Sequence, residues 1–422
     1  MNLQDQEEYA LLGSPLVQHS KVARSVQVIL RALREHFGMD VAMITEFLDG
    51  RRRLFHYVDT PHADLPVHAG DVATDRDGYC HLVVDGRLSE IIPDTAALPV
   101  ALRLAQHQPF PVGAHLSVPI RLRDGLLYGT LCCVGFAPNP ALGPRDLALM
   151  HALAQLVAHL LDDELELLAN AREAIARIRR VIDEDLFEMV YQPIFRVNGE
   201  EGVCGVEALA RFNATPRRPP DQWFREAEEV GLGAELEIAA IRKALQELAQ
   251  VEGDFFVALN CSPGTVFDPR LAAVLAALPA ARLVIEITEH APITDYPPVR
   301  ERLGRLREGG IRIAIDDTGA GYASMNHVLS LRPDIIKLDI SLTRNIHKDV
   351  MRRALAGAVA EFARLTNTVI AAEGVEEFEE LMTLQELGIR KMQGYYLSRP
   401  LPLADLQHIL QKETSGRLSF PA

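Results

Sequence analysis

The chain has 422 residues, which is enough for two or three domains with separate hydrophobic cores. Its content of 48% hydrophobic and 24% charged residues is typical of a globular protein, and no run of about 18 uninterrupted apolar residues predicts a membrane span. The formal net charge of −15 disfavours a nucleic acid polymer as partner, because such partners select basic surfaces. An acidic chain can still bind a small phosphate ester if bound cations make the local electrostatic potential positive.

The start of the chain and its cysteines indicate a reducing compartment. Residues 1–8 are acidic and lack the basic and apolar segments of a signal peptide. Five cysteines without C-x-x-C spacing argue against a disulfide framework and against a zinc site. We therefore expect a cytoplasmic protein.

The first part of the chain predicts a compact α+β domain. Residues 21–37 carry an apolar stripe at helical spacing, and Gly38 ends the predicted helix. Strand-like residues 41–48 and 52–58 flank Asp49-Gly50, and strand-like residues 116–123 and 126–134 flank Asp124-Gly125. Both patterns predict β-hairpins.

Residues 17–165 resemble a GAF domain, a sensor module for small molecules or proteins. The resemblance rests on Phe37-Gly38-Met39-Asp40-Val41-Ala42, on Gly78-Tyr79-Cys80, and on Val118-Pro119-Ile120 running to Tyr128-Gly129-Thr130-Leu131. The neighbours of Cys80 do not resemble those of bilin-attaching GAF domains, so we interpret it as a buried structural cysteine. The histidines of this part, His115 included, show no metal-binding spacing, and the sequence names no GAF ligand.

Residues 145–182 predict a helical connector that overlaps the first domain. Residues 145–192 contain neither glycine nor proline, and leucines from Leu153 to Leu168 recur at helical spacing. One or two long helices follow from this pattern. Two interpretations stay open: a helix that packs on the sheet of its own domain, and a dimer-forming rod that couples the two halves.

The remainder, residues 171–412, predicts a barrel of the α/β class related to the TIM fold. Strand-like residues 188–195 and 203–211 flank Asn198-Gly199, a gap too short for a crossover helix, so the first strand should be antiparallel to the second. Further strands alternate with helical segments at residues 255–259, 283–287, 311–315, 335–338, 369–372 and 394–397. Eight strands fit a (β/α)8 barrel. A doubly wound open sheet is the alternative, although the chain lacks a glycine-rich phosphate loop.

Polar side chains follow the predicted strands, where a barrel would bring them to one mouth. They are Glu207 and Arg211 on the second strand, Asn260 after the third, Glu286 on the fourth, Asp316 and Asp317 after the fifth, Lys337 and Asp339 on the sixth, Glu373 after the seventh, and Gln393, expected to open the eighth. Carboxylate and amide oxygens suit Mg²⁺ or Mn²⁺ rather than zinc. Two such ions a few ångströms apart are the usual arrangement for in-line attack on a phosphodiester.

Residues 171–410 are similar to EAL-domain phosphodiesterases specific for cyclic di-GMP. The resemblance rests on Tyr191-Gln192-Pro193-Ile194, Glu207-Ala208-Leu209-Ala210-Arg211, Glu286-Ile287-Thr288-Glu289, Asp316-Asp317, Lys337-Leu338-Asp339, Ala372-Glu373-Gly374-Val375-Glu376 and Gln393-Gly394-Tyr395. It implies hydrolysis of cyclic di-GMP to linear 5′-pGpG by a two-metal mechanism, under the influence of the GAF domain. It also implies a homodimer.

The resemblance assigns a role to each matching residue. Glu207, Asn260, Glu286, Asp316 and Asp317 would hold two divalent cations, Mg²⁺ or Mn²⁺. Lys337, Glu373 and Gln393 would orient and activate the attacking water. Guanine and phosphate would be bound by Gln192, Leu209 and Arg211. The residues that form the site would be supported by Glu289, Glu376 and Asp339.

The loop after Asp317 departs from the family pattern. The family usually has Phe, Thr and Ser where this chain has Thr318, Ala320 and Ala323, and Asn260-Cys261-Ser262 replaces Asn-Leu-Ser. No predicted metal ligand is lost. The altered loop keeps one alternative open, a non-catalytic cyclic di-GMP receptor with a degenerate barrel. A phosphodiesterase for other nucleotides is a third possibility.

Overall fold

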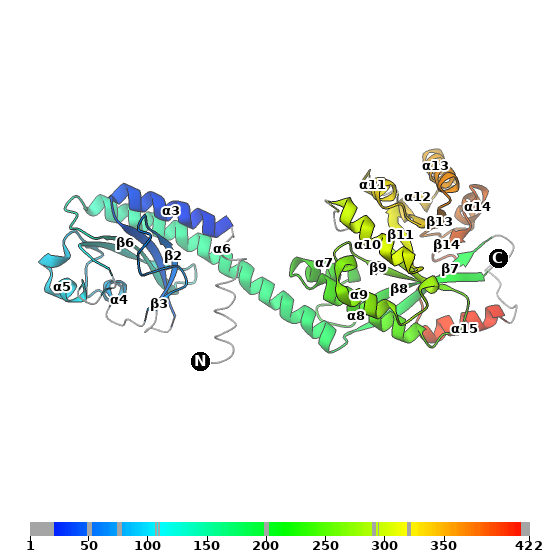
Figure 1. Cartoon of the computed structure of the whole chain (residues 1–422), viewed down its shortest axis with the longest axis horizontal. Helices are drawn as coiled ribbons and strands as arrows, with labels where there is room; N and C mark the ends of the chain where they lie inside the picture. Colours follow the sequence, from blue (N-terminus) through cyan, green and yellow to red (C-terminus); the bar gives the residue numbers. More distant parts are fainter. Residues whose placement is uncertain are drawn as a thin grey trace. The chain divides into compact units, whose positions relative to one another are not determined.

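The structure is a computed structural model that describes residues 21–48, 53–73, 78–105, 108, 110–197, 202–288, 293, 295–318 and 322–414. The chain divides into two compact units, Met1–Asn170 and Ala171–Ala422 (Figure 1). The predicted turns at Asp49-Gly50 and Asn198-Gly199 lie outside the described residues. No helix of the described part combines the length and the apolar character that a bilayer crossing requires.

The first unit is an antiparallel sheet with helices on both faces. Its elements are α3 (Lys21–Phe37), β1 (Val41–Phe47), β2 (Arg53–Asp59), β3 (Val72–Ala73), α4 (Tyr79–Val84), β4 (Ile91–Ile92), the 3₁₀ turn η1 (Thr95–Ala97), α5 (Pro99–Ala105), β5 (Ala114–Arg121) and β6 (Leu127–Gly135). The strand order is β3-β2-β1-β6-β5-β4. The predicted helix 21–37 and both predicted hairpin pairings are confirmed.

Strand alternation divides this unit into two hydrophobic cores. Ala42 and Ile44 of β1 point to the core that α3 and the long helix α6 (Pro144–Asp183) complete, whereas Val41 and Met43 point to a second core on the α4 side. Successive side chains of a strand face opposite sides of the sheet, so one strand supplies both cores. Cys132 and Cys133 of β6 are divided in the same way.

The connector is one continuous helix of 40 residues, α6. Met150, Val157 and Leu161 lie in the first unit's core, and Ile178 and Val181 lie in the core of the barrel unit. The helix thus packs on the sheet of the first unit, as the first interpretation predicted. The dimer-forming rod stays a prediction.

The second unit is a closed barrel with strand order β10-β11-β12-β13-β14-β7-β8-β9. Its strands are β7 (Phe187–Arg196), β8 (Gly202–Phe212), β9 (Phe256–Cys261), β10 (Leu283–Ile287), β11 (Arg312–Thr318), β12 (Ile335–Leu338), β13 (Val369–Ala372) and β14 (Lys391–Met392). β7 is antiparallel to both of its neighbours, and the other pairs are parallel. The predicted fold class is confirmed, and the open-sheet alternative is wrong.

Helices and short 3₁₀ turns connect the strands on the outside of the barrel. They are α7 (Pro220–Glu229), α8 (Gly233–Leu248), η2 (Thr265–Phe267), α9 (Pro269–Leu275), η3 (Ala280–Arg282), α10 (Tyr296–Glu308), α11 (Tyr322–Leu331), α12 (Ile340–Thr343), α13 (Val350–Thr366), α14 (Phe378–Glu386) and α15 (Leu403–Thr414).

The prediction of the eighth strand at residues 394–397 is wrong. The strand lies at Lys391–Met392, so Gln393 follows it instead of opening it. Gly394 starts a turn, because the backbone N–H groups of Leu397 and Ser398 donate to its carbonyl oxygen. A Cβ atom on Gly394 would lie 2.1 Å from the backbone oxygen of Val375, which explains why glycine stands here.

Candidate active site

The barrel interior contains an apolar layer with a polar layer next to it at the carboxyl ends of the parallel strands. Both layers result from the alternating direction of side chains along a strand, because residues two apart face the same side. The apolar layer includes Ala258, Val284, Ala314 and Ile335, which belong to a cluster separate from the outer core. Each polar residue of these strands lies two positions further along.

The polar layer takes one residue from each of the eight strands, directly on the strand or immediately after it. These residues are Gln192 (β7), Glu207 (β8), Asn260 (β9), Glu286 (β10), Asp316 (β11), Lys337 (β12), Glu373 (after β13) and Gln393 (after β14). All eight were predicted as site residues, and the structure brings them together at one mouth.

Lys337 lies where four carboxylates converge. Its Nζ atom lies 2.5 Å from Glu373 Oε1, 2.6 Å from Glu286 Oε2, 3.1 Å from Asp316 Oδ1 and 3.5 Å from Glu207 Oε2. The Lys337 side chain is only 3% exposed. One buried ammonium thus faces four acids, which leaves an excess of negative charge if all of them ionise.

A chain of amide hydrogen bonds fixes the Glu207 side of the ring. Asn260 Nδ2 donates to Glu207 Oε1 at 3.0 Å, and Gln393 Nε2 donates to Glu207 Oε2 at 2.7 Å. Gln393 Nε2 also lies 2.9 Å from Gln192 Oε1, and Gln192 Nε2 donates to the Ser398 carbonyl at 3.1 Å. Because both carboxylate oxygens of Glu207 accept donors, its orientation toward the mouth is set.

The pKa directions follow from this charge arrangement. Burial acts to lower the pKa of Lys337, but Asp316, Glu207, Glu286 and Glu373 together raise it well above its usual range. Burial and the neighbouring acids raise the pKa of Glu286 and of Glu373 well above the usual value, against the opposing effect of Lys337. The surrounding acids therefore favour the charged form of the lysine, whereas the protonated forms of Glu286 and Glu373 are favoured until more positive charge arrives.

The donor set fits divalent cations of the Mg²⁺ or Mn²⁺ type. Asp316 Oδ1 and Glu373 Oε1 are buried without a hydrogen-bond partner, although both lie within ion-pair distance of Lys337 Nζ. An ammonium has three N–H groups and cannot satisfy four converging carboxylates. The unsatisfied oxygens and the surplus of acids are features that hard cations would compensate.

A cleft of about 450 Å³ adjoins the ring and holds two of the predicted substrate residues. Leu209 and Arg211 line it together with Asn260 and Asp316. Arg211 donates from Nη1 to the carbonyl of Ala210 at 2.8 Å. Gln192, the third predicted substrate residue, lies in the ring instead.

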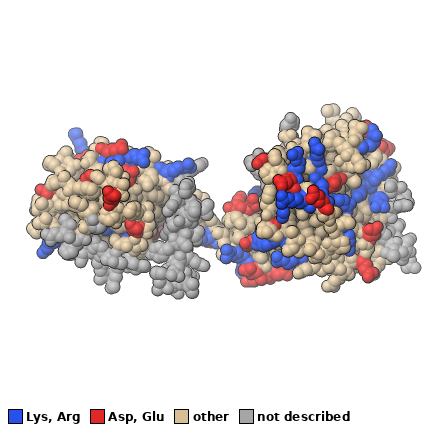
Figure 2. All heavy atoms as spheres, in the orientation of Figure 1, with Lys and Arg blue, Asp and Glu red and all other residues tan. Residues whose placement is uncertain are grey.

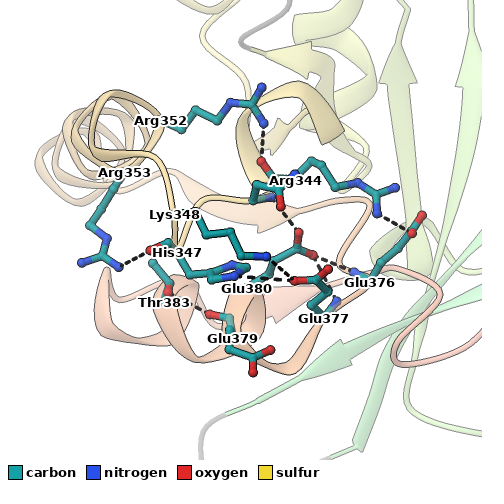
Figure 3. A network of polar contacts seen from close by, with 11 residues as sticks. Arg344, His347, Lys348, Arg352, Arg353, Glu376, Glu377, Glu379, Glu380 and Thr383 are labelled. Atoms are coloured by element: carbon teal, nitrogen blue, oxygen red, sulfur yellow. Dashed lines mark hydrogen bonds and ion pairs between the residues drawn. The ribbon is translucent and has the colours of Figure 1, made fainter.

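Two of the predicted supporting residues lie beside the ring and hold loops. Asp339 caps α12 by accepting from the Ser341 N–H at 2.8 Å. Glu376 pairs with Arg344 from the segment after α12 (Figure 3). Glu289 lies outside the described residues, and so does the side chain of Asp317.

Glu380 and Glu237 have structural roles that the sequence reasoning missed. Glu380 is fully buried, and its carboxylate accepts from the N–H groups of Asn345, Glu376 and Glu377, which ties α14 to the loop after α12 (Figure 3). Glu237 of α8 accepts from the Ser262 N–H at 2.9 Å and so fixes the loop after Asn260. The Glu380 contact has a sequence signal, a capping box at the start of α14, whereas Glu237 looks like any acid on a helix.

Comparisons with known proteins place two families on this chain. The EAL domain matches residues 175–400, and the GAF domain matches residues 22–161. A Caulobacter vibrioides protein described as an uncharacterized signaling protein is 30% identical over 397 residues, covering 92% of this chain and 45% of that protein. The cyclic di-GMP phosphodiesterase NbdA of Pseudomonas aeruginosa is 32% identical over 250 residues, covering 56% of this chain and 31% of that protein. The chain spans less than half the length of these two relatives.

A solved structure also resembles the barrel unit. The PaMucR phosphodiesterase in complex with c-di-GMP has a TM-score of 0.51 and 26% sequence identity, covering 56% of this chain and 99% of that one. The family matches and this likeness agree with the resemblances stated from the sequence.

Proposed function

The chain belongs to the EAL domain family and carries a GAF domain before its barrel, and on that premise we propose that it hydrolyses cyclic di-GMP to linear 5′-pGpG. The observation that carries the proposal is the complete polar ring, in which every strand of the barrel contributes one side chain at the same mouth. Named relatives support the substrate class, because several of them are cyclic di-GMP phosphodiesterases.

Glu207, Asn260, Glu286, Asp316 and Asp317 would hold two divalent cations in this proposal. Such cations, when bound, polarise the phosphodiester and lower the pKa of water. They would also remove an electrostatic conflict, since four acids around one lysine repel a substrate with two phosphates. Cation dependence is therefore part of the proposal.

Glu373 is the general base of the proposed reaction, and Lys337 is an electrostatic group. A raised pKa keeps the Lys337 ammonium protonated, so it cannot accept a proton, but it can stabilise negative charge on the phosphate. Glu373 faces the same mouth, where its Oε1 atom lies 2.5 Å from Lys337 Nζ, and in this proposal its carboxylate takes the proton of the attacking water. Gln393 and Gln192 would hold the ring and contact the substrate beside the cleft.

A small nucleotide suits the charge of this unit better than a nucleic acid polymer. On the face drawn in Figure 2, basic side chains of the barrel unit are interspersed with acidic ones. The formal net charge of the chain is −15. A polymer needs an extended basic surface, whereas a cyclic dinucleotide needs only the cleft with Arg211 and the cations. Control by the GAF domain, in a homodimer, completes the proposal.

The test is a hydrolysis assay of the purified chain with cyclic di-GMP and either Mg²⁺ or Mn²⁺, with products separated by chromatography. We expect 5′-pGpG as product, loss of turnover in EDTA, and loss in Asp316→Asn. Glu361→Gln, which removes a surface acid of α13, serves as the matched control. Binding of cyclic di-GMP without cleavage would favour the receptor alternative, and faster cleavage of cyclic mononucleotides or linear dinucleotides would favour the broader phosphodiesterase.

A further inference from the structure

A second cluster of candidate metal ligands lies in the first unit, away from the barrel. Cys80 of α4, His115 of β5 and Cys132 of β6 each place a ligand atom within 4.8 Å of the other two. All three residues are buried, with at most 3% exposure. They are far apart in the sequence, so the spacing of cysteines and histidines gave no sign of a site.

The fold brings these residues together through strand register. Ser117 of β5 lies opposite Cys132 of β6, so His115, two residues before Ser117, faces the same side of the sheet as Cys132. Cys80 reaches the same place from α4, which covers this face. The Tyr79 hydroxyl donates to the Ala101 carbonyl at 2.6 Å, and the Tyr79 ring packs on the His115 ring with centroids 4.8 Å apart. The short helix is thereby held against the two strands.

The ligand atoms lie beside one another. His115 Nδ1 is buried without a hydrogen-bond partner. The sulfur atoms of Cys80 and Cys132 lie 3.0 Å apart, whereas a disulfide bond measures about 2.05 Å. Two zinc–sulfur bonds of about 2.3 Å at a tetrahedral angle would set the sulfurs about 3.8 Å apart, so metal binding requires a shift of less than about 1 Å.

A supporting hydrogen-bond chain and a cavity adjoin the cluster. The Thr130 hydroxyl lies 3.0 Å from Cys132 Sγ and 2.8 Å from the Thr45 hydroxyl, which is the kind of outer contact that orients a metal ligand. All three candidate ligands line a cavity of about 590 Å³. Arg53 also lines it, and its Nε atom has no hydrogen-bond partner.

We propose that Cys80, His115 and Cys132 bind a soft divalent metal ion of the zinc type, with the fourth coordination position open to the cavity. Two thiolates and one imidazole form a known zinc ligand set, and sites with three protein ligands leave a position for water or an exogenous ligand. Thiolates select such ions over Mg²⁺ and Mn²⁺. The Arg53 guanidinium in the same cavity favours an anionic ligand at the open position.

The experiment is a Co²⁺ titration of the full chain, purified and kept under reducing, oxygen-free conditions. Cobalt bound by cysteine gives a sulfur-to-cobalt charge-transfer absorption, which the oxygen and nitrogen ligands of the barrel cannot produce. We expect one such cobalt per chain, displaced by Zn²⁺. This readout is independent of phosphodiesterase activity.

Variants on neighbouring positions make the test specific. Cys132→Ala should weaken cobalt binding at this site by more than the roughly 10–100-fold that loss of an outer partner costs. Cys133→Ala is the matched control, since Cys133 follows on the same strand but faces the other core. If Cys132→Ala does not fold, His115→Gln, which keeps both sulfurs, should show the same weakening.

Three results would overturn the proposal. They are the absence of the charge-transfer absorption in the reduced wild-type chain, its retention at full affinity in Cys132→Ala or His115→Gln, and its loss in Cys133→Ala to the same degree as in Cys132→Ala. A disulfide between Cys80 and Cys132 that persists under reductant would count against it too, because the sulfurs would then be unavailable.

Discussion

Replacing Lys337 with Met should destabilise the barrel unit in the absence of divalent cations. The substitution keeps the length of the side chain and removes the ammonium that pairs with Glu207, Glu286, Asp316 and Glu373. The four acids then lose their common partner in a buried place. Removing one partner of a buried ion pair costs about 3–5 kcal/mol, because the remaining charge is uncompensated.

The cost of proton uptake gives a second estimate of the loss of unfolding free energy in Lys337→Met. The acids can respond to the lost positive charge by taking up one proton. For a glutamate with an ordinary pKa of about 4.3, this uptake costs about 3.7 kcal/mol at pH 7. The raised pKa of Glu286 and of Glu373 makes the uptake easier, so the cost should be smaller than for an ordinary glutamate.

The assay is urea unfolding in EDTA, followed by tryptophan fluorescence. Trp223 is the single tryptophan of the chain and is fully buried in the barrel core, so its emission follows the barrel unit alone. Lys391→Met is the matched control, because burial leaves the pKa of Lys391 lowered, whereas four acids raise the pKa of Lys337 against the effect of burial. Removing Lys391 should therefore cost little or stabilise the barrel.

Two further measurements separate the charge argument from simple loss of packing. The deficit of Lys337→Met should shrink as the pH falls, because acids whose folded-state pKa is raised destabilise the fold only once they ionise. Saturating Mg²⁺ or Mn²⁺ should also reduce it, because acids that have lost their lysine should bind a cation more tightly than acids that keep it; a ligand at about 100 times its Kd contributes about 2.7 kcal/mol to the chain that binds it. An unchanged urea midpoint in EDTA, or a deficit indifferent to both pH and cations, would refute the reasoning.

Four other substitutions test the remaining assignments. Glu373→Gln keeps the size of the base and removes its proton acceptor, so single-turnover cleavage at saturating metal should fall roughly 10²–10⁴-fold with substrate binding retained; a loss under about threefold would exclude Glu373 as base, and rescue by excess metal would make it a ligand. Glu207→Gln and Asp316→Asn should each abolish turnover while the Trp223 emission stays native, and near-normal rates in either folded variant would contradict the two-cation assignment. Leu165→Pro interrupts α6, at a cost of about 3 kcal/mol or more for a helix interior, and should change the basal rate of the full chain; unchanged rate and unchanged sedimentation would contradict the coupling rod.

The sequence predicted most of the barrel because buried strands and polar strand ends are both local signals. Residues 283–287, 335–338 and 369–372 were placed with the observed bounds. Seven members of the polar ring followed from one additional rule, that parallel strands end at the same mouth. Gln192, on the antiparallel strand β7, came from the family resemblance alone. Eight of the fourteen predicted site residues lie in the ring, with Leu209 and Arg211 in the adjoining cleft.

The eighth strand could not be placed from local pattern. Gly394-Tyr395-Tyr396-Leu397 has the composition of a strand, but the close approach of Gly394 to Val375 determines its conformation. That contact joins segments that are adjacent only in the folded barrel. The observed strand has two residues, Lys391–Met392, too few to show a period.

The cysteine cluster of the first unit shows the same limit more clearly. Linear spacing detects metal sites whose ligands lie on one turn or one helix face. Cys80, His115 and Cys132 come from a helix and two strands, and only the pairing of β5 with β6 places two of them on one face. From the sequence we expected no zinc site, because the linear spacing of cysteines and histidines does not reveal ligands that come from separate elements.

The two proposed metal sites differ in ligand chemistry, and this difference determines how they can act in one chain. The barrel ring presents carboxylate and amide oxygens around Lys337, which suit Mg²⁺ or Mn²⁺, whereas the cluster in the first unit presents two sulfurs and an imidazole. Because thiolates disfavour Mg²⁺ and Mn²⁺, these ions can load the barrel without occupying the sulfur site. A cavity ligand at the open position of the sulfur site could then alter the first unit without altering the cations of the barrel. Any effect on hydrolysis would have to pass through the protein, and α6 contributes residues to both cores.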